Sequence, residues 1–219
     1  MNSTVVYIYA LTNDSGFAPC IDNKWLTLTC CKGGIRGGMR KSAAKEYLAG
    51  NNVYLLGLCS ATLAKNREML FSPVYLAKID KVIEMTEYYA DDGLASGRND
   101  DVYKLENGVL KPKAGNPHSE YNQSKDIGGQ YALCSHQFTY WGDKCGETGM
   151  DIENKFGEIF AGIRNRRGFR GYMVRREFAE FSEAIQGWDW FPKKPGKCNI
   201  ISNRAISGDP IVVGRRCGQ

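Results

Sequence analysis

The sequence predicts an α+β protein in which a mixed β-sheet is flanked by a few helices. Short runs of β-branched and aromatic residues are separated by turns rich in Gly, Asn and Asp, and helical periodicity is confined to three segments. The chain has 219 residues, of which 42% are hydrophobic and 24% charged. That composition is typical of globular proteins and excludes a disordered, collagenous or fibrous chain.

Several short segments are predicted to be strands. Residues 5–9 (VVYIY) are apolar and too few for a typical helix, and residues 25–30 alternate in period two. Residues 52–58 and 74–83 continue the pattern, and a further strand is expected at 131–135. The second half of 74–83 alternates charged and hydrophobic residues, which indicates one solvated face.

Helices are predicted in three places. Residues 40–49 (RKSAAKEYLA) are good helix formers, and Gly50 follows where a glycine commonly ends a helix. Apolar residues recur at helical spacing over 152–163 and again over 178–185. Residues 91–130 lack a sustained apolar period, so we predict a long irregular excursion of the kind that is usually functional or mobile.

The positive charge suggests a nucleic-acid surface in the C-terminal part of the chain. We predict a core domain at 1–145 and a helical, basic extension at 146–219 packed on it. The net charge is +5, and six arginines without an acid fall in a short stretch of the extension: Arg164, Arg166, Arg167, Arg170, Arg175 and Arg176. Guanidinium groups pair with phosphates and stack on bases, which favours contact with a nucleic-acid backbone. The alternative is a solvated charged face.

The cysteines and termini indicate an intracellular compartment. No stretch approaches the ~18 uninterrupted apolar residues of a membrane span, and the N-terminus lacks the layout of a secretory signal. We therefore expect a cytoplasmic protein with no membrane partner, whose eight cysteines are reduced. No Cys-x-x-Cys pair occurs, and Cys134-Ser135-His136 is the one local Cys/His pairing, so no metal site is predicted.

Two residues are candidates for bond-making chemistry. Cys20 lies in a loop between two strands, where a nearby cation would lower its pKa and make it a nucleophile. The alternative is a buried structural cysteine. Of the two histidines, His136 follows a strand and is the candidate general base, whereas His118 is expected to be a solvated loop residue.

Two further groups favour binding of a nucleotide. Lys32, Arg36 and Arg40 follow or interrupt a glycine-rich turn that leads into a helix, an arrangement that suits a phosphate. A flexible surface loop with solvated charges is the alternative. Tyr140 and Trp141 are placed to wall a base pocket, although aromatic residues after a strand are more commonly core.

Five segments resemble a known family: 12–20 (TNDSGFAPC), 26–36 (LTLTCCKGGIR), 74–89 (VYLAKIDKVIEMTEYY), 100–103 (DDVY) and 134–142 (CSHQFTYWG). The chain resembles the nucleotide modification associated domain proteins of the second class. The resemblance implies a role in modifying nucleotides or DNA bases in phage or bacterial systems, with nucleic acid or a nucleotide and other modification proteins as partners. Within these segments it draws attention to Cys20, Asp101, Tyr103 and His136.

The order of strand, cysteine loop, strand, basic loop, helix and two long strands is also similar to that of PUA-like barrels, the architecture of ASCH, EVE and YTH modules. This analogy implies a small mixed β-barrel or strongly curved sheet that holds a base.

Three functions stay open. In an enzyme, Cys20, Asp101 and His136 would be catalytic, and Lys32, Arg36, Arg40, Tyr103, Tyr140 and Trp141 would bind the nucleotide. A non-catalytic reader of a modified base would hold the base in the same predicted pocket. A scaffold subunit of a modification complex would use neither the catalytic nor the nucleotide-binding residues. The sequence identifies no cofactor.

Overall fold

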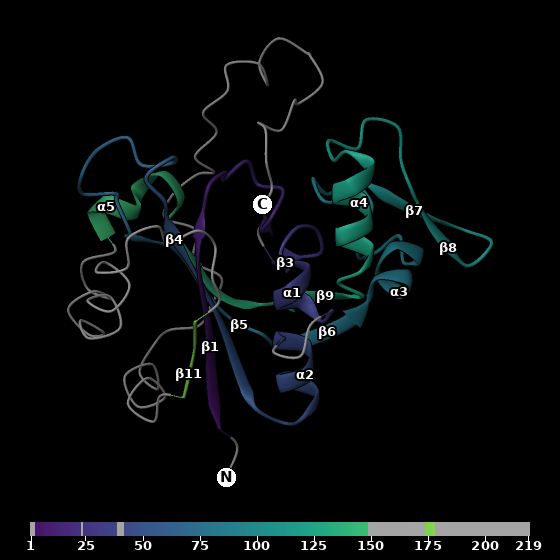
Figure 1. Cartoon of the computed structure of the whole chain (residues 1–219), viewed down its shortest axis with the longest axis horizontal. Coiled ribbons are helices and arrows are strands. Elements are labelled where there is room, and N and C mark those ends of the chain that lie inside the picture. Colours follow the sequence, from purple (N-terminus) through teal and green to yellow (C-terminus); the bar gives the residue numbers. More distant parts are fainter. Residues whose placement is uncertain (1–2, 23, 39–41, 149–173, 178–219) are drawn as a thin grey trace.

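The computed structural model describes residues 3–22, 24–38, 42–148 and 174–177. These residues form two sheets and a separate two-stranded hairpin, with short helices around them (Figure 1). The predicted α+β class is therefore confirmed. None of the sheets in the described residues is closed into a barrel, so the PUA-like barrel is not confirmed.

The larger sheet has five strands. In spatial order they are β10 (Gln137–Tyr140), β5 (Pro73–Lys78), β4 (Asn52–Cys59), β1 (Thr4–Leu11) and β11 (Val174–Glu177). β1 and β4 run parallel, and β1 is buried along its whole length. Strands in that position are near-continuous apolar runs, which explains the sequence VVYIYAL. β11 pairs antiparallel with β1, so a segment of the predicted extension joins the core sheet.

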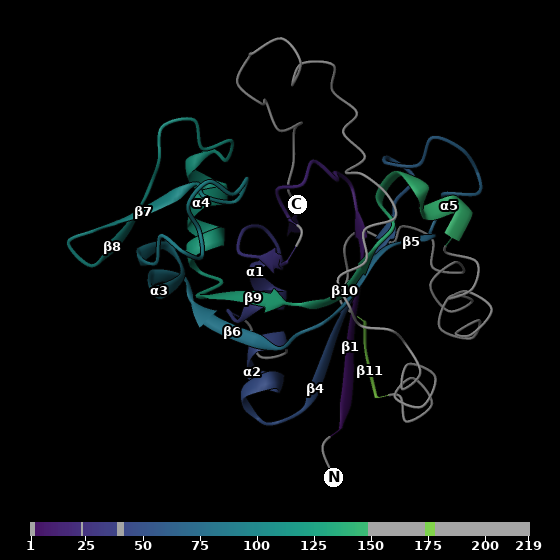
Figure 2. The same cartoon turned by 180° about the vertical axis from the view of Figure 1, so that it is seen from behind.

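The smaller sheet has four strands, in the order β2 (Cys20–Ile21), β3 (Leu26–Leu28), β9 (Tyr131–Ser135) and β6 (Lys81–Glu84). The strand predicted at 74–83 is divided, because its first half is β5 and its second half is β6. β5 pairs with β10 and β6 pairs with β9, so this two-stranded ribbon passes from one sheet to the other (Figure 2). The Asp80 carboxylate fixes the bend by accepting the N–H of His136 at 2.6 Å.

The helices are short: α1 (Gly33–Arg36), α2 (Ala43–Leu48), α3 (Met85–Ala90), α4 (Glu120–Ile127), the 3-10 turn η1 (Gly142–Lys144) and α5 (Cys145–Thr148). α2 lies inside the helix predicted at 40–49. The Ser42 hydroxyl accepts the Lys45 N–H at its start, and Gly50 follows with φ +83°. In the described part of the chain, no helix has the length and apolar character needed to cross a bilayer. The helices predicted at 152–163 and 178–185 lie outside the described residues.

The excursion at 91–130 contains more regular structure than the sequence predicts. It holds the hairpin β7 (Tyr103–Glu106) and β8 (Val109–Pro112), followed by α4. Asn107 and Gly108 both have positive φ, which is the signature of a tight hairpin turn. In Figures 1 and 2 the hairpin projects from the molecule beside α4.

Two hydrophobic clusters form the core. One surrounds β1, β4 and β5, and the other lies between the smaller sheet, α3 and the hairpin. The second cluster is rich in tyrosine, and hydroxyls of Tyr88, Tyr89 and Tyr103 reach two buried aspartates, Asp100 and Asp126. The excursion is thereby attached to the smaller sheet through polar groups as well as apolar contacts.

Candidate active site at Cys31

Cys31 lies on a sharp turn between β3 and α1. Cys31 and Lys32 have φ values of 56° and 43°, a left-handed conformation that costs a residue with a side chain roughly 1–2 kcal/mol. The turn is held from two sides. The Cys31 N–H donates to Asp126 Oδ1 at 2.6 Å, and Arg36 Nε donates to the Cys31 carbonyl at 2.8 Å. Backbone conformations of this kind are concentrated at functional sites, where the surrounding structure holds them in place.

The glycines around this turn allow two backbones to meet. A Cβ on Gly33 would lie 2.6 Å from the Lys125 carbonyl oxygen, and one on Gly38 would lie 2.4 Å from the Gly128 carbonyl oxygen. Only residues without side chains permit this approach. The close packing of α1 against the end of α4 brings Asp126, the only buried residue of α4, against the backbone of Cys31.

Cys31, His118 and Asp126 form a continuous line of polar groups. Cys31 Sγ is 3.5 Å from His118 Nε2, and His118 Nδ1 is 2.5 Å from Asp126 Oδ2. His118 and Asp126 are buried, with 5% and 1% of their surfaces exposed, whereas Cys31 is half-buried. Cys31 is therefore the least buried residue of the line. We call these three residues with Tyr103 and Arg36 the Cys31 cluster.

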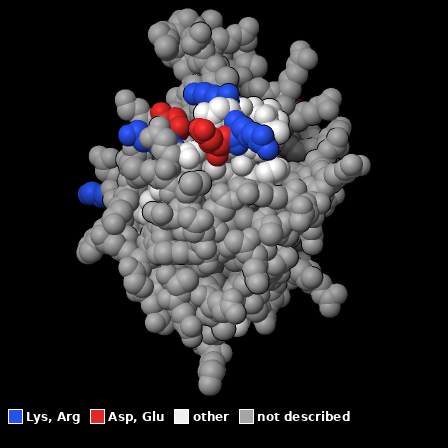
Figure 3. Space-filling view, turned by 90° about the vertical axis from the view of Figure 1, so that its left-hand side faces the viewer, with Lys and Arg blue, Asp and Glu red and all other residues white. Residues whose placement is uncertain are grey.

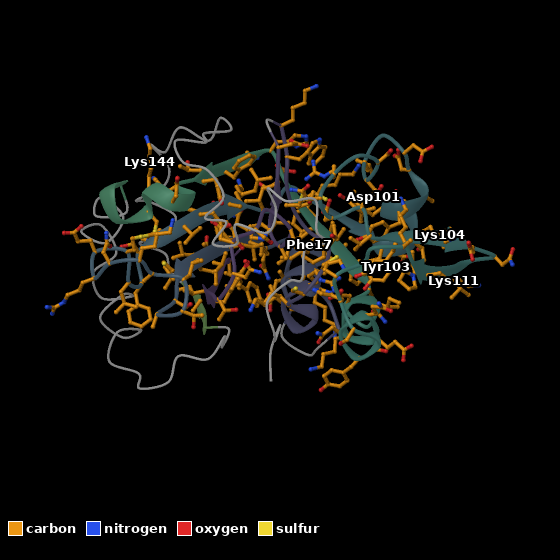
Figure 4. The ribbon with its side chains drawn as sticks, turned by 90° about the horizontal axis from the view of Figure 1, so that it is seen from above. Phe17, Asp101, Tyr103, Lys104, Lys111 and Lys144 are labelled. Atoms are coloured by element: carbon orange, nitrogen blue, oxygen red, sulfur yellow. The ribbon has the colours of Figure 1, made fainter. Side chains whose placement is uncertain are left out.

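Tyr103 and Phe17 fix the two inner members of the line. The Tyr103 hydroxyl donates to Asp126 Oδ2 at 2.9 Å. Burial, followed by the charge of Asp126, raises the pKa of Tyr103 well above its usual range, so its hydroxyl remains a donor at neutral pH. Phe17 packs edge-on against the His118 ring, with the ring centroids 5.1 Å apart. Figure 4 shows Phe17 and Tyr103 on the same half of the molecule.

This arrangement is suited to nucleophilic catalysis. The imidazole ring can take the thiol proton through Nε2, while the carboxylate on Nδ1 holds the ring in position and stabilises its positive form. The nucleophile, the base and the orienting group each have the required neighbour. The reacting atom would be the sulfur of Cys31.

The same three side chains are also a candidate metal group, although no metal site was predicted. One ligand atom from each lies within 4.8 Å of the other two, and thiolate, imidazole and carboxylate are the ligands that zinc prefers. However, Cys31 and Asp126 face opposite nitrogens of the His118 ring. An ion bound by the thiolate and Nε2 would therefore have Asp126 behind the ring as an outer partner.

Arg36, a predicted phosphate ligand, is occupied within the protein. Its side chain is completely buried, and its guanidinium donates to the carbonyls of Cys31, Asp126 (2.5 Å) and Tyr131 (2.8 Å). It therefore supports the turn instead of facing solvent. Lys32 is half-buried, and its ammonium lies 5.0 Å from the centroid of the Tyr9 ring. Arg40 lies outside the described residues.

Cys20 is buried in a different polar network, the Cys20 cluster, with Asp22, Thr27, Arg98 and Asp100. The Asp100 carboxylate accepts from Thr27 Oγ1 at 2.6 Å and from Arg98 Nε at 3.3 Å. Arg98 also pairs with Asp22. Burial, followed by the charge of Asp100, raises the pKa of Cys20 to about 12. Its thiol is therefore protonated at neutral pH and is a weak nucleophile.

The remaining predicted residues do not join one recess. Asp101 pairs with Lys113 at 2.6 Å, and of the 100–103 segment only Tyr103 reaches the Cys31 cluster. His136 is exposed and paired with Asp80, and its ring is tilted by 40° against that of Trp25, with the ring centroids 3.5 Å apart. Tyr140 and Trp141 are buried in the larger core cluster, where the Tyr140 hydroxyl donates to Asp14.

The basic segment at 164–176 lies mostly outside the described residues. Of its six arginines, Arg175 and Arg176 belong to β11, opposite Tyr7 and Val6. Around α5, at the end of the molecule far from the β7–β8 hairpin, exposed cations and acids alternate (Figure 3). Lys144 marks this end in Figure 4, far from Lys104 and Lys111 on the hairpin. The described residues of that face therefore present no surface of a single charge.

None of the three members of the line was predicted from the sequence as a site residue, and Cys31 was noted only within a segment that resembles the family. His118 was expected to be a solvated loop residue, and this is wrong, because it is buried against Asp126. Asp126 was not singled out. The available signals were the scarcity of histidine and a cysteine between a strand and a glycine-rich turn. Neither signal specifies that the two segments meet.

Of three comparisons with known proteins, one found a match. No curated protein and no solved structure matched the chain. The profile described as nucleotide modification associated domain 2 matches residues 3–196, which include every residue of the Cys31 cluster. The match extends across the boundary predicted at 145. Because it covers most of the sequence, the chain belongs to the nucleotide modification associated domain 2 family.

Proposed function

We propose that this protein is a thiol-dependent enzyme that modifies a nucleotide or a DNA base, with Cys31 as the nucleophile. His118 is the general base and acid, and Asp126 is the group that orients it. The observation that supports this proposal is the line from Cys31 Sγ through both nitrogens of His118 to Asp126. Family membership supports the nucleotide as the substrate.

Binding and context follow from the charges and the family. Lys32, next to the nucleophile, would contact a phosphate of the substrate, and the arginines at 164–176 would contact a nucleic-acid backbone. The substrate base would be carried in phage or bacterial DNA, and other proteins of a modification system would be partners.

An enzyme accounts for the Cys31 cluster better than a reader does. A module that only binds a base needs stacking groups and hydrogen bonds to the base edge. It does not need a buried His–Asp pair aligned on a thiol, whose burial carries a desolvation cost. A catalytic role would account for a structure that carries this desolvation cost. A non-catalytic reader of a modified base would bind its target and leave it unchanged.

The two histidines of the chain provide a direct test. Cells that express the modification system with this protein, or with Cys31→Ala, His118→Ala or His136→Ala, supply DNA that is digested to nucleosides and analysed by mass spectrometry. We expect the modified nucleoside to disappear with Cys31→Ala and His118→Ala and to persist with His136→Ala. Lys144→Ala, an exposed change at the far end of the molecule, serves as the neutral control.

Other results would contradict the proposal. Loss with His136→Ala alone would return the catalytic role to the residue predicted from sequence. Identical nucleosides from the wild type and from the Cys31→Ala, His118→Ala and His136→Ala strains would exclude a catalytic role for either histidine and for Cys31. Circular dichroism of each purified variant separates loss of chemistry from loss of folding.

A further inference from the structure

This inference rests on the proposed function and specifies its reaction. We propose that Cys31 acts by acyl transfer, attacking the carbonyl carbon of an acyl donor and forming a thioester. The substrate class is therefore a compound with an amide, ester or thioester carbonyl, from which the acyl group passes to water or to an amine of a nucleotide.

The position of the imidazole favours this reaction. His118 Nε2 faces the sulfur, at 3.5 Å, and its other nitrogen is held by Asp126. A proton taken from sulfur is therefore kept next to the carbon that the sulfur attacks. Acyl transfer uses that proton at the same carbon, because the leaving group departs from it. When a thiol instead adds to a ring carbon of a base, the proton is needed at the neighbouring ring carbon.

Phosphoryl transfer is disfavoured by the arginine. Enzymes that transfer phosphoryl groups surround the phosphate with cationic donors. Arg36 is the arginine that contacts Cys31, but its guanidinium is completely buried and donates to three backbone carbonyls. Among the described residues of the cluster, no other arginine is placed on the thiol.

Thiol–disulfide exchange is disfavoured by the neighbouring cysteine. Cys30 is completely buried, and its sulfur contacts the Tyr89 hydroxyl at 3.5 Å within the second core cluster. Burial also raises its pKa well above the usual range. A resolving thiol has to be reactive and accessible, so Cys30 does not fit that role.

The proposed steps balance without a further reagent. The Cys31 proton moves to His118 Nε2, and the thiolate forms a bond to the carbonyl carbon. The tetrahedral adduct collapses, the bond to the leaving group breaks, and Nε2–H returns the proton to that group. Water or an amine then attacks the thioester, gives its proton to Nε2, and the S–C bond breaks with the proton returned to sulfur.

The test uses p-nitrophenyl acetate as a generic acyl donor on the full chain. We expect a burst of nitrophenolate stoichiometric with protein, and one acetyl group that peptide mapping assigns to Cys31 and that neutral hydroxylamine removes. His118→Ala should slow the burst by about a hundredfold, the scale of general-base catalysis. Asp126→Asn should slow it less, and Cys31→Ala should abolish it. Lys144→Ala should leave it unchanged.

The two halves of the reaction are then separated. Turnover after the burst in buffer alone identifies water as the acceptor, and faster turnover on adding dCMP or dAMP, with an acylated nucleotide as product, identifies an amine. Acetylation that is equal in wild type and Cys31→Ala, or a burst unaffected by His118→Ala, overturns acyl transfer.

The inference and the proposed function fail in different ways. If nucleosides change in a Cys31-dependent manner while Cys31 is never acylated, the enzyme stands and acyl transfer is wrong. If Cys31 is acylated but no nucleoside depends on it, the reaction stands and the nucleotide substrate is wrong. Zinc that copurifies with the wild type, is lost in His118→Ala and blocks acetylation until chelated would overturn the nucleophile in favour of a metal ligand.

Discussion

The Cys31 cluster and the Cys20 cluster share several kinds of residue and differ in the partners of their buried aspartates. Each has one cysteine, one buried aspartate and one arginine, and in each a tyrosine hydroxyl contacts the carboxylate. In the Cys20 cluster the arginine faces the carboxylate. In the Cys31 cluster the arginine faces backbone carbonyls, and a histidine faces the carboxylate.

The two buried aspartates therefore have different effects on the nearby thiols. Asp100 receives bonds from Thr27, Thr29 and Arg98, and its charge helps to keep the Cys20 proton in place. Asp126 holds a proton acceptor next to a half-buried sulfur. One buried carboxylate is therefore bound by an arginine and hydroxyls, whereas an equally buried one holds His118 against the thiol of Cys31.

The largest expected difference is in thiol reactivity. With a pKa of about 12 instead of 9, Cys20 has about a thousandfold less thiolate at neutral pH than an ordinary thiol. Iodoacetamide at pH 7 followed by peptide mapping should therefore label Cys31 at least that much faster than Cys20. Comparable labelling in the folded protein would remove the distinction between the clusters. Labelling in urea, where both thiols are exposed, is the control.

The next effect is on stability. Asp100→Asn removes the buried charge that pairs with Arg98, and we expect it to lower the free energy of unfolding by about 3 kcal/mol. Asp126→Asn removes no arginine pair and should cost about 1–2 kcal/mol, while reducing the p-nitrophenyl acetate burst. Urea unfolding measures both costs. The contrast between Asp100 and Asp126 is wrong if Asp126→Asn lowers the free energy of unfolding more than Asp100→Asn does and leaves the burst intact.

The sequence was sufficient for strands whose pattern is local. The apolar run at 5–9 and the helix-forming residues before Gly50 specify β1 and α2 without help from the rest of the chain. The strand at 74–83 is different, because its pattern continues through the bend at Asp80. That bend depends on a bond to His136, which lies 56 positions away.

The site depends almost wholly on distant contacts. Cys31 meets His118 and Asp126 across 87 and 95 positions, and no local spacing encodes such pairs. The polar residues of 91–130 look like a loop because their partners lie in another segment. Cys20 and His136 were the more prominent candidates because each follows or flanks a predicted strand, but burial and partners decide reactivity.

Alkaline pH should destabilise the protein through its buried thiols. The pKa values of Cys20 and Cys134 are raised to about 12 in the folded state from an ordinary value of 9.0. The unfolded chain therefore loses these protons first. Stability is complete below pH 9 and falls as the pH rises toward 12, by about 1.4 kcal/mol per thiol at pH 10.

Urea unfolding under reducing conditions between pH 8 and pH 10 measures this slope. Cys20→Ala should reduce the slope by the contribution of one thiol. An unchanged slope would mean that Cys20 is more accessible than its burial indicates.

The smallest expected difference is between the contributions of the Tyr103 and Tyr88 hydroxyls. Tyr103 donates to Asp126 at 2.9 Å, whereas Tyr88 lies at 3.2 Å from an Asp100 carboxylate that already has shorter bonds. Tyr103→Phe should therefore cost about 1.5 kcal/mol and Tyr88→Phe about 0.5 kcal/mol in urea unfolding. Because Tyr103 shares the oxygen that faces His118, its loss should also slow iodoacetamide labelling of Cys31 several-fold. Equal labelling in both variants would show that Tyr103 contributes to folding and not to the alignment of the thiol.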